Sequence, residues 1–342
     1  MKARVANLRY AALVLTAVLG VAMNMPGFAA GGDANDGLSS VKLSTHGLSG
    51  AGENVYVLDT GNHRVQTFNG KGVYRSQFDH SFDLPTGIAL DVHSNIYVKD
   101  GNQNCQADKF DSHGKYILQF GSCSNGTIGP GIFDNTGKAA TNVAGDVWVT
   151  SPDYYYMQKF TGSGKFLKIV CMANVGVQNC PPATSFEVQP QGVALDASGN
   201  IYVTNVYPFQ GGFNVVKFDS RGKYLATIGA AGSGNGQFND PEGIALDSKG
   251  NIYVADSGNN RVEKFNKQGV YQSQFGSQGS GNGQFKYPVG IAFGTAGEIY
   301  VTDVGNNRVE EFNSHGSYRG QFGSPGQGNG EFSAPYGIAI RK

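Results

Sequence analysis

The sequence has few of the features on which nucleic-acid-binding proteins depend. Only 15% of its 342 residues are charged, and 26 basic residues balance 26 acidic ones. Lys and Arg form no run anywhere along the chain. Binding to a phosphate backbone requires a basic patch. We therefore expect no nucleic-acid partner.

Motifs for common catalytic centres are also missing. The chain has four Cys without a CxxC spacing, six His, and no GxSxG motif. These absences argue against a thiolate zinc site and against a serine hydrolase of the usual type. We expect no catalytic residue, no metal and no cofactor.

One long apolar run occurs, and it lies at the N-terminus. Lys2, Arg4 and Arg9 precede the apolar segment 11–23, and Gly27-Phe28-Ala29 offers small residues for cleavage. This order is typical of an export signal, and the run is short for a membrane span. We expect a signal peptide at 1–30 and a flexible, Gly/Ser-rich lead-in at 31–50. An uncleaved anchor is the alternative. The expected location is extracytoplasmic, periplasmic or secreted, with no integral membrane segment after signal removal.

Glycine, by contrast, is abundant, with 51 residues, and it recurs in a repeated text. Residues 241–276 and 288–323 have nearly the same sequence. The aromatic residue of the NIYV-like run recurs every 41 to 54 residues. Each repeat holds four short runs of alternating apolar residues separated by turns rich in Gly, Asn and Asp. This pattern predicts four-stranded antiparallel sheets that must pack on one another.

The two ends of the repeat region predict a closed ring. The first repeat begins at NVYV (54–57) without an inner PxGIA run, and the chain ends with an unaccompanied PYGIAIRK (335–342). Pairing them removes an open sheet edge. We predict an all-β, six-bladed β-propeller over residues 51–342. The expected blades are 335–342 with 54–78, then 85–121, 136–170, 190–229, 241–276 and 288–323.

The repeats resemble the NHL-repeat family over about residues 52–342. The resemblance rests on GNHRVQTF (61–68), GNNRVEKF (258–265) and GNNRVEEF (305–312), and on GSGNGQF (232–238). It implies a six-bladed propeller. The third repeat departs most, because GKAATN (137–142) replaces PxGIAxD.

Four Cys in an exported chain suggest two disulfides with three possible connectivities. Cys105 and Cys123 both belong to the second blade, and Cys171 and Cys180 flank a loop after the third. We favour these local pairs.

The second residue of each PxG run is expected to face the mouth of the central channel. These residues are Thr86, Gln191, Glu242, Val289 and Tyr336, with Lys138 or Ala139 roughly matching in the third blade. Propeller amidating lyases, which resemble this fold, place zinc-binding His residues around such a ring. No His falls there in this chain. Glu242 is a possible general base by its position, but a lone carboxylate at an exposed strand start is more often solvated.

Acid–base pairs recur in several blades and invite a functional reading. Asp59, Asp256 and Asp303 follow the second strand, and an Arg lies five residues behind each of them; Asp100 recurs without one. Because scaffold parts repeat whereas a site breaks symmetry, we interpret these pairs as turn-stabilising elements.

Asymmetry marks the loops between the second and third strands of blades 3 and 4. The aromatic residues there are Tyr154, Tyr155, Tyr156, Tyr207, Phe209 and Phe213. They can form a platform for a ligand, or they can fill the space between blades.

Two functional hypotheses remain. The favoured one is an exported, monomeric binding or scaffold module for a protein, peptide or carbohydrate. The alternative is a lyase or hydrolase that resembles the propeller amidating lyases or virginiamycin B lyase, with its site at the channel mouth. An enzyme would need a metal or paired acid–base groups there.

Overall fold

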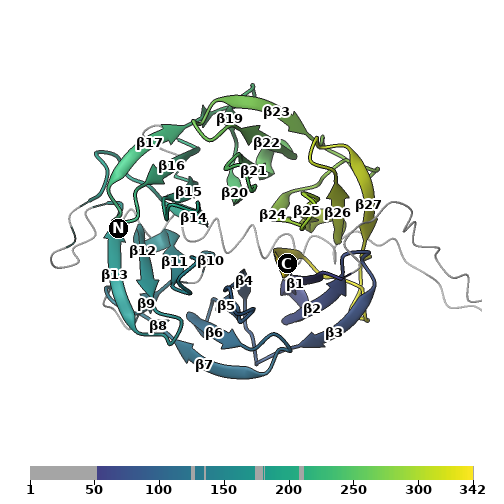
Figure 1. The fold of residues 1–342 in the computed structure, drawn as a ribbon, viewed down its shortest axis with the longest axis horizontal. Coiled ribbons are helices and arrows are strands. Elements are labelled where there is room, and N and C mark those ends of the chain that lie inside the picture. Colours follow the sequence, from purple (N-terminus) through teal and green to yellow (C-terminus); the bar gives the residue numbers. More distant parts are fainter. Residues whose placement is uncertain are drawn as a thin grey trace, which may run out of the picture.

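The computed structural model describes residues 52–341 except 125–127, 135, 174–179, 181 and 208–211. The expected signal and lead-in lie outside the described residues, as does Phe209. Six four-stranded antiparallel sheets surround a central axis (Figure 1). The predicted all-β, six-bladed propeller is therefore confirmed. Within the described ranges, no helix is long and apolar enough to cross a membrane.

Each blade runs from an inner strand at the axis to an outer strand at the rim. Blade 1 contains β28 (Pro335–Arg341), β1 (Asn54–Asp59), β2 (Arg64–Asn69) and β3 (Tyr74–Phe78). Blade 2 contains β4 (Pro85–Leu90), β5 (Ile96–Asp100), β6 (Gln106–Phe110) and β7 (Tyr116–Phe120). Blade 3 contains β10 (Ala139–Thr141), β11 (Val147–Ser151), β12 (Tyr156–Phe160) and β13 (Phe166–Cys171).

The second half of the ring follows the same plan. Blade 4 contains β14 (Pro190–Leu195), β15 (Ile201–Asn205), β16 (Asn214–Phe218) and β17 (Tyr224–Ile228). Blade 5 contains β20 (Pro241–Leu246), β21 (Ile252–Asp256), β22 (Arg261–Phe265) and β23 (Tyr271–Phe275). Blade 6 contains β24 (Pro288–Phe293), β25 (Ile299–Asp303), β26 (Arg308–Phe312) and β27 (Tyr318–Phe322).

Short elements complete the loops of the ring. Single 3₁₀ turns join the second and third strands of four blades: η1 (Thr60–Asn62), η2 (Pro152–Tyr154), η3 (Ser257–Asn259) and η4 (Val304–Asn306). Two-stranded parallel pairs lie in loops between blades: β8 (Ser122–Cys123) with β9 (Ile132–Phe133), and β18 (Ala230–Ala231) with β19 (Gln237–Phe238).

The hydrophobic core is divided among the six junctions between blades. Alternating strand residues face one neighbour or the other, so that Ile252 and Val254 pack with blade 4 whereas Tyr253 packs with blade 6. Comparable clusters fill the other four junctions. Because a blade buries its two faces only against its neighbours, we expect the ring to unfold as one unit.

Closure of the ring depends on β28. This strand pairs antiparallel with β1, for example Val57 with Ile338 and Asn54 with Arg341. The C-terminal strand, yellow, lies beside the purple first strand in Figure 1. The predicted closure by the C-terminal strand is confirmed.

Two disulfides tie loops to the blades. Cys105 pairs with Cys123 and Cys171 with Cys180, at sequence separations of 18 and 9 residues. The local pairing predicted from the sequence is the one in the structure. Each link restricts the unfolded chain over a short loop.

Deletion of residues 335–342 should destroy cooperative unfolding. The deletion leaves β1 without its inner partner and exposes strand edges that promote aggregation. Circular dichroism melts and light scattering would measure both effects. Removal of residues 341–342 alone is the matched control and should melt like the full chain. An equally cooperative melt of the longer deletion would contradict closure by β28.

Replacement of Cys171 and Cys180 together by Ser should lower the free energy of unfolding by about 2–3 kcal/mol, because the unfolded chain loses a short closed loop. Denaturant titration would measure the loss, and peptide mapping without reductant would verify the pairing. The variant should be insensitive to reductant at this loop. A crossed pairing in the map would refute the assignment.

Candidate functional site

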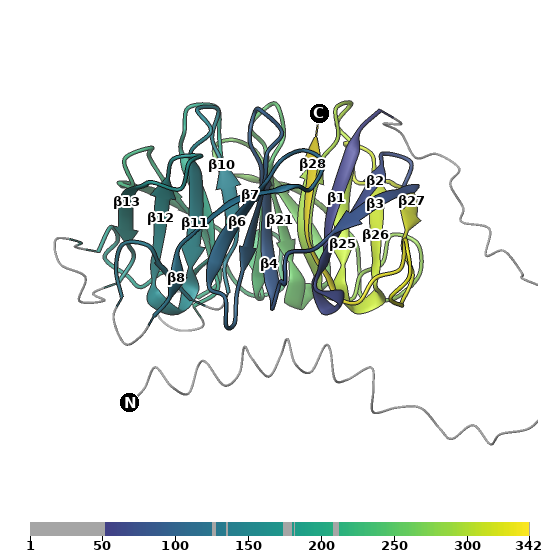
Figure 2. The same cartoon turned by 90° about the horizontal axis from the view of Figure 1, so that it is seen from below.

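All inner strands begin on one face of the ring, which we call the mouth face. The first residue of each inner strand pairs with the last residue of the second strand, as Pro241 does with Asp256. The mouth face therefore also carries the loops between second and third strands. It is opposite the end of β28 that is marked C in Figure 2. The two predicted groups, the channel-mouth residues and the aromatic loops of blades 3 and 4, thus lie on the same face.

Four polar side chains from four blades meet at the channel mouth. Lys138 Nζ lies 3.5 Å from Glu242 Oε2, and Gln191 Nε2 donates to the same oxygen at 3.1 Å. Tyr336, from blade 1, is the fourth member. Its ring covers the lysine, with Nζ 3.7 Å from the ring centre. We call Lys138, Gln191, Glu242 and Tyr336 the mouth cluster.

The mouth cluster is closed to solvent. Glu242 is 0% exposed, and the other three members are also buried. Burial lowers the pKa of Lys138 to about 8 against the opposing attraction of Glu242. Burial first, and then Glu242, raises the pKa of Tyr336 well above its usual value. The expectation that Glu242 is a lone, solvated carboxylate is wrong, because its partners arrive from three other blades.

Three polar atoms of the cluster lack a hydrogen-bond partner within the described part of the chain. They are Lys138 Nζ, Gln191 Oε1 and Glu242 Oε1, and each is covered. Unpaired buried polar atoms cost stability, on the order of 1–3 kcal/mol each. The cluster therefore has unused hydrogen-bonding and chemical capacity in a dry environment.

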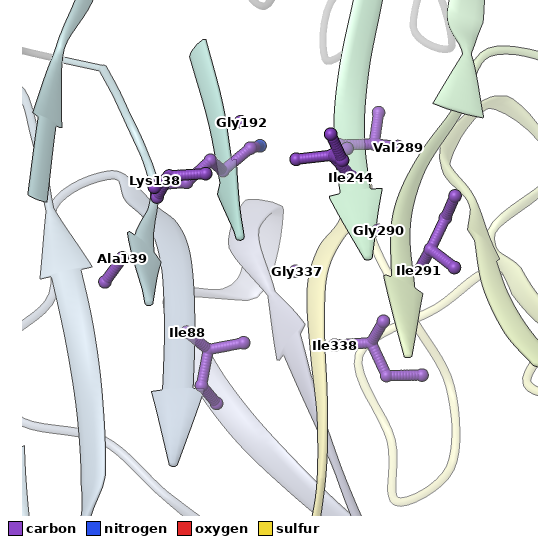
Figure 3. Close-up of a pocket in the computed structure, with 12 residues that line it drawn as sticks. Ile88, Lys138, Ala139, Gly192, Ile244, Val289, Gly290, Ile291, Gly337 and Ile338 are labelled. Carbon is purple, nitrogen blue, oxygen red and sulfur yellow. The ribbon is translucent and has the colours of Figure 1, made fainter. Parts of the chain in front are cut away.

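Lys138 is also an exception to the repeat. By strand register it occupies the position of Gly87, Gly192, Gly243, Gly290 and Gly337 in the other blades. The sequence left Lys138 or Ala139 as the match for the second PxG residue, whereas the register gives that place to Gly137. Figure 3 shows Lys138 extending from beside β10 into the channel, the charged member of an otherwise aliphatic and glycine lining. The cavity there is small, about 70 Å³.

Thr86 and Val289, the remaining predicted ring residues, contact neighbouring blades. Thr86 Oγ1 donates to Gly137 O at 2.9 Å, which links blade 2 to blade 3. Val289 is fully buried with Val304 and Tyr336 in an apolar cluster at the mouth. Neither residue joins the mouth cluster.

The aromatic residues of blades 3 and 4 divide into core and surface. Tyr156 is 0% exposed, and its hydroxyl donates to Ile132 O at 2.7 Å. Phe213 packs against the core between blades 4 and 5. Tyr154, Tyr155 and Tyr207 stay half-exposed. We call these three the aromatic patch.

Two rings of the aromatic patch pair across the junction of blades 3 and 4. Tyr155 and Tyr207 meet edge to face with centroids 5.9 Å apart. A hydrogen bond to Glu187, followed by burial, raises the pKa of Tyr207 to about 12. Tyr155 has φ 54°, in the left-handed region. In the matching 3₁₀ turns of blades 1, 5 and 6 this conformation belongs to His63, Asn260 and Asn307.

The repeated Asp–Arg pairs are part of the scaffold, as interpreted from the sequence. Arg261 Nε binds Asp256 Oδ2 at 2.7 Å. Its Nη2 donates to Gly234 O and Gln237 O, at 2.8 and 2.7 Å, in the loop before blade 5. Arg64 and Arg308 bind Asp59 and Asp303 in the same way. Asp100 accepts the backbone N–H of Leu84 instead, at 2.8 Å.

Two buried glutamates were not predicted from the sequence. Glu263 and Glu310 are 0% exposed, and each accepts a backbone N–H from the glycine-rich loop at 3.1 Å. Burial raises their pKa values to about 7 and about 8, against the attraction of the neighbouring Arg. In blade 1, Gln66 makes the same loop contact. The same repeat position holds Gln66 in blade 1 and a Glu in blades 5 and 6. This recurrence of a polar residue was the sequence signal for a shared buried contact.

No metal centre is formed among the described residues, where no group of three or more His, Cys, Asp or Glu could hold an ion. His63, His93, His113 and His315 lie in turns, as expected, and His80 stacks on Tyr116 at the rim with centroids 3.9 Å apart. His46 lies outside the described residues.

Comparison with known families decides the identity of the repeat. The family described as NHL repeat matches residues 238–265 and 285–312, which span the inner, second and third strands of blades 5 and 6. These two stretches are NHL repeats, and the chain that carries them folds as a six-bladed β-propeller. The NHL resemblance noted from GNxRVxxF is thereby confirmed.

Similar proteins share the fold of this NHL propeller. The mouse protein "E3 ubiquitin-protein ligase TRIM32" is 26% identical over 236 residues, which cover 61% of this chain and 33% of the mouse protein. A chain in the crystal structure of a nidogen/laminin complex has 14% identity and a TM-score of 0.61, with 84% of this chain and 98% of that one covered. Virginiamycin B lyase from Staphylococcus aureus has 14% identity and a TM-score of 0.54, with 86% and 89% covered. At such identities the two structures establish likeness of fold alone.

Glu310→Gln should remove a pH-dependent loss of stability. The folded-state pKa of Glu310, about 8, lies above its usual 4.5. The stability that protonated Glu310 gives the folded state is therefore fully present below about pH 4.5 and is lost as the pH rises through 8. We expect the variant to exceed the wild type by roughly 3–5 kcal/mol at pH 8.5 and to match it near pH 4.5. Urea unfolding across this range measures the difference.

The reciprocal variant is the control for this prediction. Gln66→Glu places a carboxyl in the same contact of blade 1 and should introduce the missing pH dependence. Identical pH profiles for the wild type and both variants would show that these glutamates titrate alike in the folded and unfolded chains.

Proposed function

We propose that this chain is a non-enzymatic, extracytoplasmic binding module whose mouth face, over blades 3 and 4, takes a protein, peptide or carbohydrate ligand. The aromatic patch would supply the main contacts. Large rings with a polar tip suit such a surface, because they give wide contact area for little lost side-chain freedom. The rigid ring would hold the loops in place before the ligand arrives.

The conformation of Tyr155 is the observation that carries the proposal. A bulky side chain in the left-handed region is strained by roughly 1–3 kcal/mol, whereas Asn tolerates it better. Blades 5 and 6 place Asn there. Blade 3 instead places a half-exposed Tyr against Tyr207. A strained conformation kept for an aromatic residue at the surface is consistent with selection for binding.

The location rests on separate support. Two disulfides in a chain of this size are typical of oxidising compartments outside the cytoplasm. The described cysteines include none that is free. The predicted N-terminal signal agrees with this location.

The proposal is tested by selecting ligands for the wild-type ring and then measuring whether substitutions in the aromatic patch weaken their binding. Glycan arrays and displayed peptide libraries would be screened against the wild-type ring, and each binder titrated against a Tyr155→Asn/Tyr207→Ala variant. We expect a loss of about 2 kcal/mol, or roughly 30-fold in Kd, because a few aromatic anchors dominate interfaces. The single variant Tyr155→Asn should also melt slightly higher, since it relieves backbone strain.

His63→Ala is the matched control, since His63 is exposed at the equivalent turn of blade 1. It should leave binding intact. Binders that tolerate the Tyr155/Tyr207 variant but respond to changes on another face would place the binding surface elsewhere. A variant that unfolds would show the rings to be core.

A further inference from the structure

The mouth cluster brings an amine, a carboxamide and a carboxyl group together. Lys138 Nζ and Gln191 Nε2 both approach one oxygen, Glu242 Oε2, at 3.5 and 3.1 Å. Lys138 belongs to blade 3, Gln191 to blade 4 and Glu242 to blade 5. A carboxyl group between an amine and a carboxamide can carry a proton from the first to the second.

The same groups are shut off from other reactants. Lys138 Nζ, the carbonyl oxygen of Gln191 and the second oxygen of Glu242 are all covered and lack hydrogen-bond partners among the described residues. The ring of Tyr336 lies over the amine. With these atoms covered, the groups available to react with them are those of the mouth cluster.

We propose that Lys138 and Gln191 form an intramolecular isopeptide bond, with Glu242 as the proton carrier, so that blade 3 is covalently locked to blade 4. This inference is independent of the binding function proposed above. It assigns a covalent modification to the centre of the ring.

The reaction balances without any further reagent. Lys138 first transfers a proton to Glu242, which leaves a neutral amine and a neutral carboxyl group. The Nζ lone pair attacks the side-chain carbonyl carbon of Gln191, and a new N–C bond forms. The tetrahedral intermediate loses the C–Nε2 bond, and the leaving nitrogen takes a proton from Glu242 while Nζ returns one to it. The products are a secondary amide, ammonia and a protonated Glu242.

The surroundings favour both the first step and the product. Burial lowers the pKa of Lys138, which raises the share of neutral, nucleophilic amine. A neutral carboxyl group and an amide are also less costly to bury than an ion pair. Proximity within a rigid ring replaces the entropy loss of a bimolecular reaction.

Strand geometry places the two reactants next to each other. Thr150 Oγ1, which accepts the Lys138 N–H at 2.8 Å, donates to Gln191 O at 2.7 Å. The backbones of the two residues are thus joined through one hydroxyl group. Their side chains then converge on the same oxygen of Glu242, one blade further round the ring.

Mass spectrometry of the purified, reduced full-length chain tests the proposal. Loss of ammonia makes the linked chain lighter than its sequence by about 17 Da. Trypsin should release a branched peptide that joins residues 116–159 to residues 169–217, because modified Lys138 is not cleaved. The linked chain should also run faster than a linear one in a denaturing gel.

Three variants should restore the full mass. Glu242→Gln removes the proton carrier, Gln191→Ala removes the carboxamide, and Lys138→Gly restores the residue that the other five blades carry. The last variant keeps the test valid if the first two fail to fold. Lys99 is the internal control, since its buried amine donates to the carbonyl oxygens of Asp100 and Asp134 at 2.8 and 3.0 Å and should stay unmodified.

Each result decides the matter. A folded wild-type chain at full mass, or a mass loss that maps outside Lys138 and Gln191, would overturn the bond. A Glu242→Gln chain that is still lighter by about 17 Da would overturn the role of Glu242.

Discussion

Six inner strands have to meet around one axis, and the backbone of each lies almost against the next. A Cβ added at Gly243 would lie 1.9 Å from Val289 O, and one at Gly192 would lie 2.3 Å from Glu242 O. Such distances are far below any van der Waals contact, so a side chain there would push neighbouring blades apart. In the five blades that carry it, the glycine of the PxG run therefore permits this close approach. The interblade cores and the pairing of β28 with β1 depend on that closeness.

This constraint explains why one exception to the glycine, Lys138, affects residues of several blades at the centre of the ring. In blade 3 the inner strand is shorter, and Lys138 occupies the glycine position. Its side chain leaves through the channel and meets Glu242 and Tyr336 on the far side. A charge introduced where five blades have none must be compensated in a dry space. The mouth cluster is that compensation, and each of its four members comes from a different blade.

The repeat made most of the fold predictable, because strand alternation and turn residues act within one blade. PxGIAL, NIYV and RVEKF in blade 5 became an inner, a second and a third strand. The surroundings of Glu242 were beyond sequence reasoning, because Lys138 lies 104 residues earlier and its register is hidden by the missing Pro in GKAATN. The burial of Tyr156 was likewise open, since alternation alone does not separate Tyr156 from its neighbour Tyr155. Where a residue meets its own turn, as Asp256 meets Arg261, local reasoning succeeded.

Repetition and divergence have separate physical roles in this ring. Blades 5 and 6 keep the complete Asp–Arg clamp on the preceding loop, and they anchor the ring without offering an asymmetric surface. Blades 3 and 4 lack the arginine of this clamp. Their loops between the second and third strands hold Tyr155 and Tyr207 instead. A disulfide, Cys171–Cys180, lies beside this region at the end of β13. This covalent link restricts the chain next to a loop that lacks the clamp. A strained aromatic residue can persist there because the ring around it is rigid.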